Sequence, residues 1–201
     1  MLAPMDLLAA AVFAVASSIT PGPNVLMVAA ASASGGLRAA LPMMLGISVG
    51  FPAMLVALGL GLAVPVQASA QVRGLLSMAA FLWIVWLAFR IATAPMPGEA
   101  EARPPMGFLG AAGFQWVNPK AWLIAVAALG AFVPPGADMV AGSLVLALLF
   151  AAVSLPCLLV WAWFGAALRR VLSSPRAFRA FSVAMGALLA ASVLPMLRPP
   201  A

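Results

Sequence analysis

The sequence contains no histidine and a single cysteine, Cys157. Zinc sites of the cysteine and histidine type therefore lack a ligand set, an internal disulfide lacks a second thiol, and Ser-His catalysis lacks its base. Charged residues make up only 7% of the chain, and four of them are acidic. These scarcities predict a protein without a cofactor or a metal site and exclude the common hydrolase chemistries.

Hydrophobic residues, by contrast, account for 66% of the 201 residues, and the mean hydropathy is +1.17. A soluble domain of this size cannot hide so much apolar surface in its core. Apolar runs of about 20 residues, long enough to cross ~30 Å of hydrocarbon, recur between short polar breaks. They predict an all-α integral membrane protein whose six transmembrane helices span residues 6–31, 39–64, 72–94, 108–133, 138–168 and 177–197.

The six segments form one predicted membrane domain, residues 1–201, with no stretch left over for a soluble domain. Residues 1–94 hold the first three helices, the polar and proline-rich stretch 95–107 is a linker, and residues 108–201 hold the other three. The N-terminal MLAPMDLL lacks the basic region of a signal peptide, so we expect the first span to be retained.

Basic residues are distributed unequally between the two sides of this predicted membrane domain. One set of alternate connections carries Arg38, Arg90, Arg103, Arg169, Arg170, Arg176 and Arg179, whereas the other carries Arg73 and Arg198. Cytoplasmic connections carry the excess of basic residues, so the 95–107 linker is predicted to be cytoplasmic and both termini outside the cytoplasm. Arginines that lie at lipid headgroups and set this topology explain the net charge of +6, so we expect no nucleic-acid partner.

The first predicted span is interrupted by S-I-T-P-G-P-N-V-L-M, residues 18–27. Pro21 and Pro23 have no backbone N–H, so the carbonyls of Ser17 and Ile19 lose their helical partners. Non-helical backbone at membrane depth is tolerated only where protein covers it or where it lines a wet cavity, as in the binding sites of transporters. The stretch therefore predicts two half-helices, with a simple proline kink as the alternative.

Both interruptions carry residues that begin a helix. In the first, Gly22 suits the cap, Pro23 suits the first helical position, and Asn24 is an alternative cap. In F-Q-W-V-N-P-K-A-W, residues 114–122, Asn118 is a good N-cap and Pro119 follows it. The two breaks lie about half the chain apart, and each opens a set of three spans. Because each set contains an odd number of spans, the two sets cross the membrane in opposite orientations. This predicts two inverted repeats of three helices each, with helices 1 and 4 interrupted.

The two new helix N-termini are expected to approach the membrane midplane from opposite sides. A helix N-terminus carries partial positive charge and free N–H donors, so it can bind a carboxylate. The freed carbonyls of Ser17, Ile19 and Gln115 would accept bonds from an ammonium group or a coupling cation. One site could therefore bind both ends of a zwitterion.

Lys120 falls inside the fourth predicted span, although the chain uses arginine at every other basic position. An ionisable residue within a membrane is energetically costly and by default indicates function. Lysine provides a compact, titratable cation at a site where arginine would stay protonated. The alternative is that the span begins later and Lys120 extends to the membrane interface.

These motifs resemble those of the LysE/RhtB-type family of amino-acid exporters. The resemblance rests on T-P-G-P-N at residues 20–24, A-S-G-G-L-R-A-A-L-P-M-M-L-G-I at 33–47 and N-P-K-A at 118–121, and it covers essentially the whole chain. It implies a multi-pass protein of the bacterial inner membrane that exports an amino acid or a derivative by proton-coupled alternating access. Carried over residue by residue, it marks a substrate site of Thr20, Pro21, Gly22, Pro23, Asn24, Asn118, Pro119 and Lys120.

One departure from the family concerns the proton. Some relatives carry an acidic residue in span two, where this chain has G-I-S-V-G-F with Phe51. The predicted spans hold no carboxylate except Asp6 and Asp138 at their outer boundaries. The proton carrier is then Lys120, a boundary aspartate or the amine of the substrate.

Other functions stay open at this point. The chain could transport a metal cation or a small organic anion, although the lack of intramembrane carboxylates and thiolates argues against a cation. An intramembrane enzyme would need a Ser-Lys pair, such as Ser17, Ser18 or Ser48 with Lys120. A non-transporting assembly subunit would not need a buried lysine. The GxxxG pair Gly46 and Gly50 predicts close helix packing within the chain, with a homodimer as the alternative.

Overall fold

The computed structural model describes residues 4–62, 69–95, 105–171 and 174–192. Throughout these ranges the regular structure is helical, and they contain no strand. The elements are α1 (Pro4–Ile19), α2 (Pro23–Gly35), α3 (Leu37–Ala57), the π-helical turn η1 (Leu58–Leu62), α5 (Ala70–Ala92), α6 (Phe108–Phe114), the 3-10 turn η2 (Gln115–Val117), α7 (Pro119–Phe132), α8 (Met139–Val171) and α9 (Pro175–Ala191). The described part of each predicted span is helical except at the breaks, residues 20–22 and 118, and at a few span ends. Residues 63, 64 and 193–197 of two spans lie outside the described ranges.

Both predicted interruptions are present. The first separates α1 from α2 after Ile19, and the two helices meet at an angle of 51°. Gly22 is the N-cap of α2, and Pro23 occupies its first turn. The second lies at η2, after which Asn118 caps α7 and Pro119 occupies the first turn. The structure therefore has half-helices at both places, as the proline and cap residues predict.

Length and composition allow two of the described helices to cross a membrane, Leu37–Leu62 and Met139–Leu168. The bent pair Asp6–Ile19 and Pro23–Gly35 makes a third if it is counted as one span. Three shorter apolar helices, Ser77–Ala92, Phe108–Val117 and Pro119–Phe132, accompany them.

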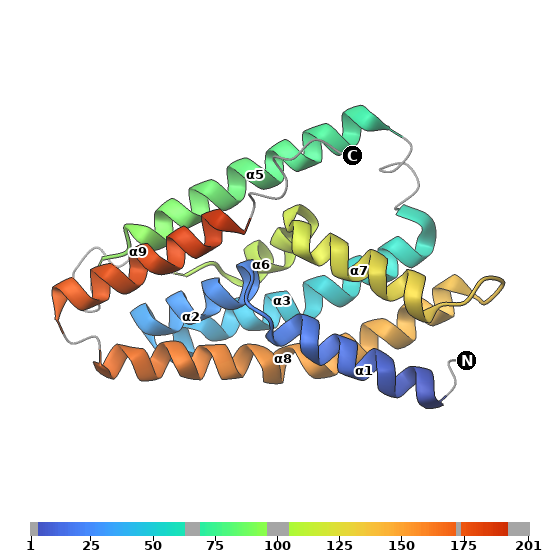
Figure 1. The fold of residues 1–201 in the computed structure, drawn as a ribbon, viewed down its shortest axis with the longest axis horizontal. Coiled ribbons are helices and arrows are strands. Elements are labelled where there is room, and N and C mark those ends of the chain that lie inside the picture. The colour runs from blue at the N-terminus through green and yellow to red at the C-terminus, as the bar shows by residue number, and fades with distance from the viewer. Residues whose placement is uncertain (1–3, 63–68, 96–104, 172–173, 193–201) are drawn as a thin grey trace.

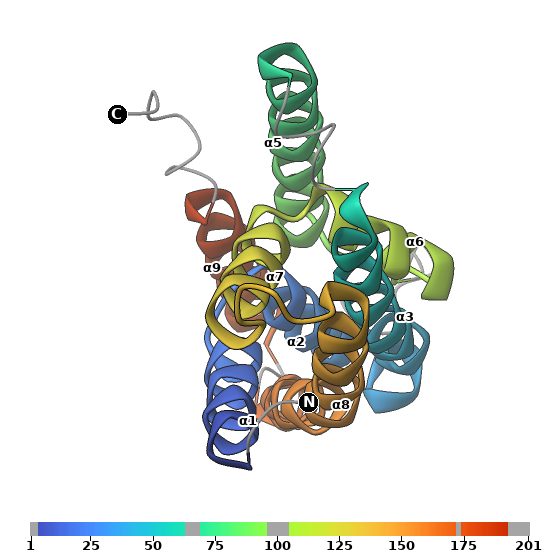
Figure 2. The same cartoon turned by 90° about the vertical axis from the view of Figure 1, so that its right-hand side faces the viewer.

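The helices form a bundle in which α8 is the longest rod (Figure 1). One side of α8 packs against α1, α2 and α3, whereas α5 pairs with α9 on the opposite side of the molecule. Figure 2, which looks along the bundle, places α2 and α7 between these two layers. The half-helix α2 therefore lies in the interior of the bundle, where the broken backbone meets other helices.

The apolar interior consists of two separate clusters on either side of the helix breaks. One contains residues of α2, α5, α6 and the first half of α3, including Met27 and Met44. The other contains residues of α1, α7 and the second half of α3, including Met54 and Ala125. The clusters meet at the level where α1 gives way to α2 and η2 gives way to α7. A polar layer at this level is consequently enclosed by apolar packing above and below.

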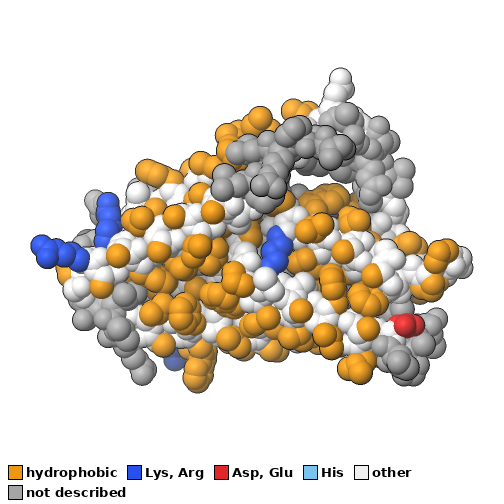
Figure 3. Space-filling model, viewed as in Figure 1, with side chains coloured by type: hydrophobic (Ala, Val, Ile, Leu, Met, Phe, Trp, Pro, Cys, Tyr) orange, Lys and Arg blue, Asp and Glu red, His pale blue; other side chains and the backbone are white. Residues whose placement is uncertain are grey.

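Apart from a basic side chain midway along the face in view, the charged side chains in Figure 3 lie at the ends of the bundle. Arg38 lies in the first turn of α3, Arg90 in the last turn of α5, and Arg176 and Arg179 in the first turns of α9. These turns lie at the end of the molecule where α2 joins α3 and α8 joins α9 (Figure 1). The described basic residues of the predicted cytoplasmic side therefore share one end of the bundle.

The GxxxG pair of α3 lies against α6. A Cβ at Gly46 would overlap the backbone carbonyl of Phe108, and one at Gly50 would lie 2.5 Å from the Cα of Ala112. Small residues allow two membrane helices to approach to this distance. The prediction that this pair serves packing within the chain is confirmed, and the same face is not free for a second copy.

We expect Gly50→Ala to destabilise the protein, because the new methyl group would press on the backbone of α6. Overpacking of this kind costs about 1–3 kcal/mol. Gly113→Ala is the matched control, since nothing lies within 4 Å of a Cβ at that position and alanine favours a helix. Thermal unfolding in detergent measures both, and equal melting temperatures would contradict the close α3–α6 contact.

Candidate functional site

Three amide side chains meet where the two broken helices face each other. The Asn24 Nδ2 donates to the Gln115 Oε1 at 2.9 Å, and the Gln115 Nε2 donates back to the Asn24 Oδ1 at 3.1 Å. The Asn118 Nδ2 also donates to the Asn24 Oδ1, at 3.3 Å. Gln115 is 0% and Asn118 1% exposed. This buried amide cluster joins the first half of the chain to the second through reciprocal hydrogen bonds, which are strong in a low-dielectric interior.

The Lys120 side chain joins the same two segments. Its Nζ donates to the backbone carbonyl of Thr20 at 2.6 Å and to that of Pro21 at 3.3 Å. These carbonyls lie in the break between α1 and α2, where no helical N–H reaches them. Lys120 is partly buried between α1 and α7 and does not extend to either end of the bundle. The ammonium group thus supplies donors to two carbonyls that the break leaves without helical partners.

Two other carbonyls of the breaks already have donors. The indole Nε1 of Trp161, in α8, donates to the carbonyl of Ile19 at 2.9 Å. The backbone N–H of Asn118 donates to the carbonyl of Gln115 at 3.3 Å. The prediction that the carbonyls of Ile19 and Gln115 are free for a substrate ammonium group is therefore wrong in this conformation, because a side chain and a tightened helical turn occupy them.

Asn24 does not serve as the alternative cap of α2, since its side chain is bonded to Gln115 and Asn118 instead. Gly22 is the cap, without a side-chain bond. Its backbone is extended, with φ of 177°, which any residue can adopt, so the role of its glycine is to leave space for a neighbouring side chain. A Cβ there would lie 2.6 Å from the Cδ and 3.0 Å from the Nζ of Lys120. Asn118, in contrast, caps α7 as predicted, because its Oδ1 accepts from the N–H of Lys120 at 3.1 Å.

A small cavity of about 50 Å³ lies beside the amide cluster. Five of the eight predicted site residues line it, namely Thr20, Gly22, Asn24, Asn118 and Lys120. Pro21 contributes only its carbonyl to Lys120, and Pro23 and Pro119 act by starting the two helices. The volume holds a few water molecules and is far below the ~300–1,000 Å³ of a ligand pocket. The central site is therefore closed in this structure.

Three side chains of the site were not identified from the sequence. The amide of Gln115 organises the cluster, and a lone glutamine in an apolar helix was the signal for it. Trp161 and Ser154 come from α8, and Ser154 lines the small cavity with a buried hydroxyl that has no hydrogen-bond partner. Nothing in the local sequence places α8 beside the breaks.

The arrangement does not form a Ser-Lys pair. The hydroxyl of Ser17 donates to the carbonyl of Ala14 in its own helix at 3.2 Å. The Lys120 Nζ bonds to backbone carbonyls. A nucleophile and its base must be within hydrogen-bond reach of each other, so this geometry favours binding over covalent catalysis.

Comparison with known proteins gives the family. The family model described as LysE type translocator matches residues 15–194, which include both helix breaks and the whole amide cluster. The chain belongs to the LysE type translocator family. The resemblance deduced from the T-P-G-P-N and N-P-K-A motifs is thereby confirmed.

Relatives of this translocator are named as efflux proteins. A cysteine/O-acetylserine efflux protein of Salmonella choleraesuis (strain SC-B67) is 35% identical over 133 residues, which are 66% of this chain and 68% of the relative. The protein of the same name from Escherichia coli (strain K12) is 37% identical over 120 residues, 59% of this chain and 61% of the relative. No solved structure gives a significant match. The family and these relatives support the prediction of an amino-acid exporter in a membrane, and they are transporters rather than enzymes.

We expect Gln115→Leu to destabilise the translocator, because it leaves the amide of Asn24 with unpaired groups inside the bundle. Leaving a buried polar group unsatisfied costs about 1–3 kcal/mol. Thermal unfolding in detergent measures the change, with Gln71→Leu on the exposed surface of α5 as the matched control.

A double-mutant cycle distinguishes the cluster from a general loss of packing. The cost of Asn24→Leu combined with Gln115→Leu should be smaller than the sum of the single costs, since each single change already breaks the same bonds. Additive costs would show that the two amides do not depend on each other.

Proposed function

We infer that this translocator exports an amino acid or an amino-acid derivative across the bacterial inner membrane through the site between its broken helices. One observation carries the proposal: the Lys120 Nζ of the second broken helix donates to the Thr20 and Pro21 carbonyls of the first. A partly buried cation held by backbone carbonyls is available for an incoming anion. The site residues are Thr20, Pro21, Gly22, Pro23, Asn24, Asn118, Pro119 and Lys120.

The chemistry of this contact suits a zwitterion. The carboxylate of an amino acid can take over the ammonium of Lys120 through a charge-assisted hydrogen bond. The carbonyls of Thr20 and Pro21 then become free to accept from the substrate's own ammonium group. Binding thus exchanges one ammonium group for another on the same carbonyls, and the Lys120 Nζ keeps a hydrogen-bond acceptor throughout.

The proposed mechanism is alternating access by two inverted repeats. Each repeat would comprise a broken helix, a long helix and a further helix: α1–α2, α3 and α5 in the first, and α6–α7, α8 and α9 in the second. All six would cross the membrane. Each apolar cluster contains residues of both repeats, so movement between the repeats would separate one cluster at a time and open the small central cavity to that side.

Proton coupling is part of the proposal, with Lys120 or the amine of the substrate as the carrier. The described carboxylates are remote from the site. Asp6 lies in the first turn of α1, and Asp138 precedes α8, where its Oδ1 accepts from the N–H groups of Val140 and Ala141. A carboxylate engaged in this way as a helix cap is poorly suited to carry protons through the centre.

The proposed orientation places both termini outside the cytoplasm and the 95–107 linker inside. It is supported by the described arginines, which share the end of the bundle where α8 joins α9. A homodimer stays a prediction, and it would need a surface other than the Gly46–Gly50 face.

The alternatives receive less support. Among the described residues, no group of three histidine, cysteine, aspartate or glutamate side chains could hold a metal ion, which disfavours a metal exporter. An organic anion without an ammonium group would leave the Thr20 and Pro21 carbonyls unpaired once Lys120 turned to it. The relatives' names make cysteine and O-acetylserine the first substrates to test.

Efflux of preloaded radiolabelled amino acids tests the function. We expect the intact protein to speed the loss of at least one substrate from cells or vesicles. At equal membrane abundance, Lys120→Ala should reduce this efflux about tenfold or more, since it removes the charged group at the site. Pro23→Ala should also abolish the increase in efflux over cells or vesicles without the protein, because it restores a backbone N–H in the break.

Arg179→Ala is the matched control, since it removes a basic residue from the exposed surface of α9. If both site variants transport as well as the intact protein, the motifs only shape the fold and the proposed site is wrong. If the intact protein moves no amino acid, the substrate class is wrong.

The orientation is tested by labelling single cysteines in a Cys157→Ser background with a membrane-impermeant maleimide. We expect Ala137→Cys, in the exposed turn before α8, to react in intact cells. Thr93→Cys, exposed at the end of α5, should react only after the membrane is permeabilised. The reverse pattern would place the termini in the cytoplasm.

A further inference from the structure

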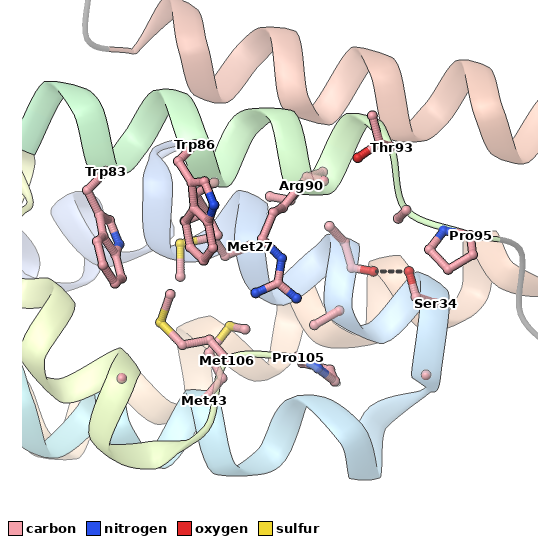
Figure 4. Close-up of a pocket in the computed structure, with 17 residues that line it drawn as sticks. Met27, Ser34, Met43, Trp83, Trp86, Arg90, Thr93, Pro95, Pro105 and Met106 are labelled. Atoms are coloured by element: carbon pink, nitrogen blue, oxygen red, sulfur yellow. Dashed lines mark hydrogen bonds between the residues drawn. The ribbon is translucent and has the colours of Figure 1, made fainter. Parts of the chain in front are cut away.

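A second and larger cavity lies where α2 and α5 end and α6 begins (Figure 4). Its volume is about 520 Å³, a size typical of sites for small organic ligands. The lining is mostly apolar and includes Met27, Met43, Trp83, Trp86, Leu87 and Met106. In Figure 4 the two tryptophan rings extend from α5 toward the methionines of the opposite wall. The surface is suited to an uncharged, polarisable side chain.

Arg90 brings a positive charge into this cavity. Its guanidinium group extends from the last turn of α5 into the open space and lies 5.0 Å from the centroid of the Trp86 ring (Figure 4). This cation–π contact holds the side chain in position. The described part of the chain has two carboxylates, Asp6 and Asp138, and both lie at the opposite end of the bundle (Figure 1). Within that part, Arg90 has no acidic partner.

The hydroxyl groups of the cavity are already bonded. Ser34 donates to the carbonyl of Ala30 at 3.0 Å, and Thr93 donates to that of Phe89 at 2.8 Å. Arg90 is then the group of the lining that can bind a charged ligand. The ends of α2 and α5, which carry partial negative charge, also lie at this cavity and suit an ammonium group.

One face of α2 connects this cavity with the central site. Asn24 lines the central cavity, whereas Met27, Ala31 and Ser34 line the large one. These four positions follow the three- and four-residue spacing of a helix and so share one face. A ligand that leaves the large cavity along α2 therefore reaches the amide cluster.

One face of α3 makes the same connection. Met43 lines the large cavity, and Ile47 and Phe51, four and eight residues later, line the central one. The side chains of Met27 and Met43, 2% and 4% exposed, are buried between the two cavities. Methionine is flexible and adapts to different packings, so these two side chains can close the connection in one conformation and open it in another.

We propose that the large cavity is the cytoplasmic entry chamber of the exporter and binds the cargo before it reaches Lys120. The cargo is an amino acid with an uncharged, apolar or thioether side chain. Its carboxylate pairs with Arg90, and its side chain lies among the methionines and tryptophans. This inference rests on the proposed function and adds a first binding site, which selects against charged side chains.

Protection of a cysteine at the chamber tests this binding directly. The reporter is Ser34→Cys in the Cys157→Ser background, purified and reconstituted in phosphatidylcholine vesicles, with Thr93→Cys as a second reporter. L-Methionine is the probe, and L-methioninol, which lacks the carboxylate, is its control. L-Methionine should slow maleimide labelling, and L-methioninol and L-lysine should not. Equal labelling with and without L-methionine at both reporters would overturn the proposal.

The role of Arg90 is tested in the same assay. Arg90→Gln should raise the L-methionine concentration needed for protection about tenfold, since a hydrogen-bonded charge is lost. Arg90→Lys should retain part of the protection, and Arg179→Gln, which removes a basic residue from the same end of the bundle, should retain all of it. Unchanged protection in Arg90→Gln would overturn the assignment of the carboxylate.

Two further experiments are needed. One distinguishes binding in the chamber from binding at the central site, and the other distinguishes bound amino acid from bound lipid. In Lys120→Ala, which disables the proposed transport site, L-methionine should still protect Ser34→Cys, so the chamber can be established even if the proposed export mechanism fails. If protection requires Lys120, the binding occurs at the central site and the chamber is refuted. If phosphatidylglycerol vesicles protect the reporter and L-methionine does not, an anionic lipid occupies the cavity and the cargo proposal is wrong.

Discussion

The structure depends on one constraint: backbone carbonyls that lose their helical N–H partners in a low-dielectric interior must find other donors. Pro21 and Pro23 interrupt the helix between α1 and α2, and the carbonyls at this break lack helical donors. Lys120 from α7 and Trp161 from α8 supply the donors to the carbonyls of Thr20, Pro21 and Ile19. The break is therefore stable only when the second half of the chain has packed around it, so the defect that creates the site also ties the two halves together.

This arrangement makes the centre of the molecule polar and leaves the rest apolar. The amides of Asn24, Gln115 and Asn118 form a layer between two hydrophobic clusters. A fully bonded amide layer specifies one alignment of the half-helices, because any slip would leave buried donors without acceptors. Yet each bond within it can be exchanged for a bond to a polar substrate. The layer can thus hold the closed state and also open to cargo, which a purely apolar contact could not do.

Each of the two cavities holds a basic side chain in position without an acidic partner among the described residues, and the contact that holds it differs between them. At the centre, Lys120 is held by neutral carbonyls, so its charge is directed but not neutralised by a carboxylate. At the large cavity, the ring of Trp86 holds Arg90 through a cation–π contact, which likewise leaves the charge of Arg90 available to an anion. A continuous helix face on α2 joins them. With Arg90 and Lys120 at successive positions along an apolar path, the carboxylate of a substrate would move from the large cavity to the central site and have a cationic partner at each.

The sequence by itself determined the local features. The apolar runs predicted the helices of the described ranges, the prolines located both breaks, and Asn118 could be recognised as the cap of α7, because these effects involve residues a few positions apart. Tertiary structure decided the rest: Asn24 bonds across the molecule instead of capping α2, Trp161 donates to the carbonyl expected to be free, and Gly22 leaves space for the Lys120 side chain. These partners lie about half the chain or more apart, and only the crossing of the helices sets which side chain reaches which carbonyl.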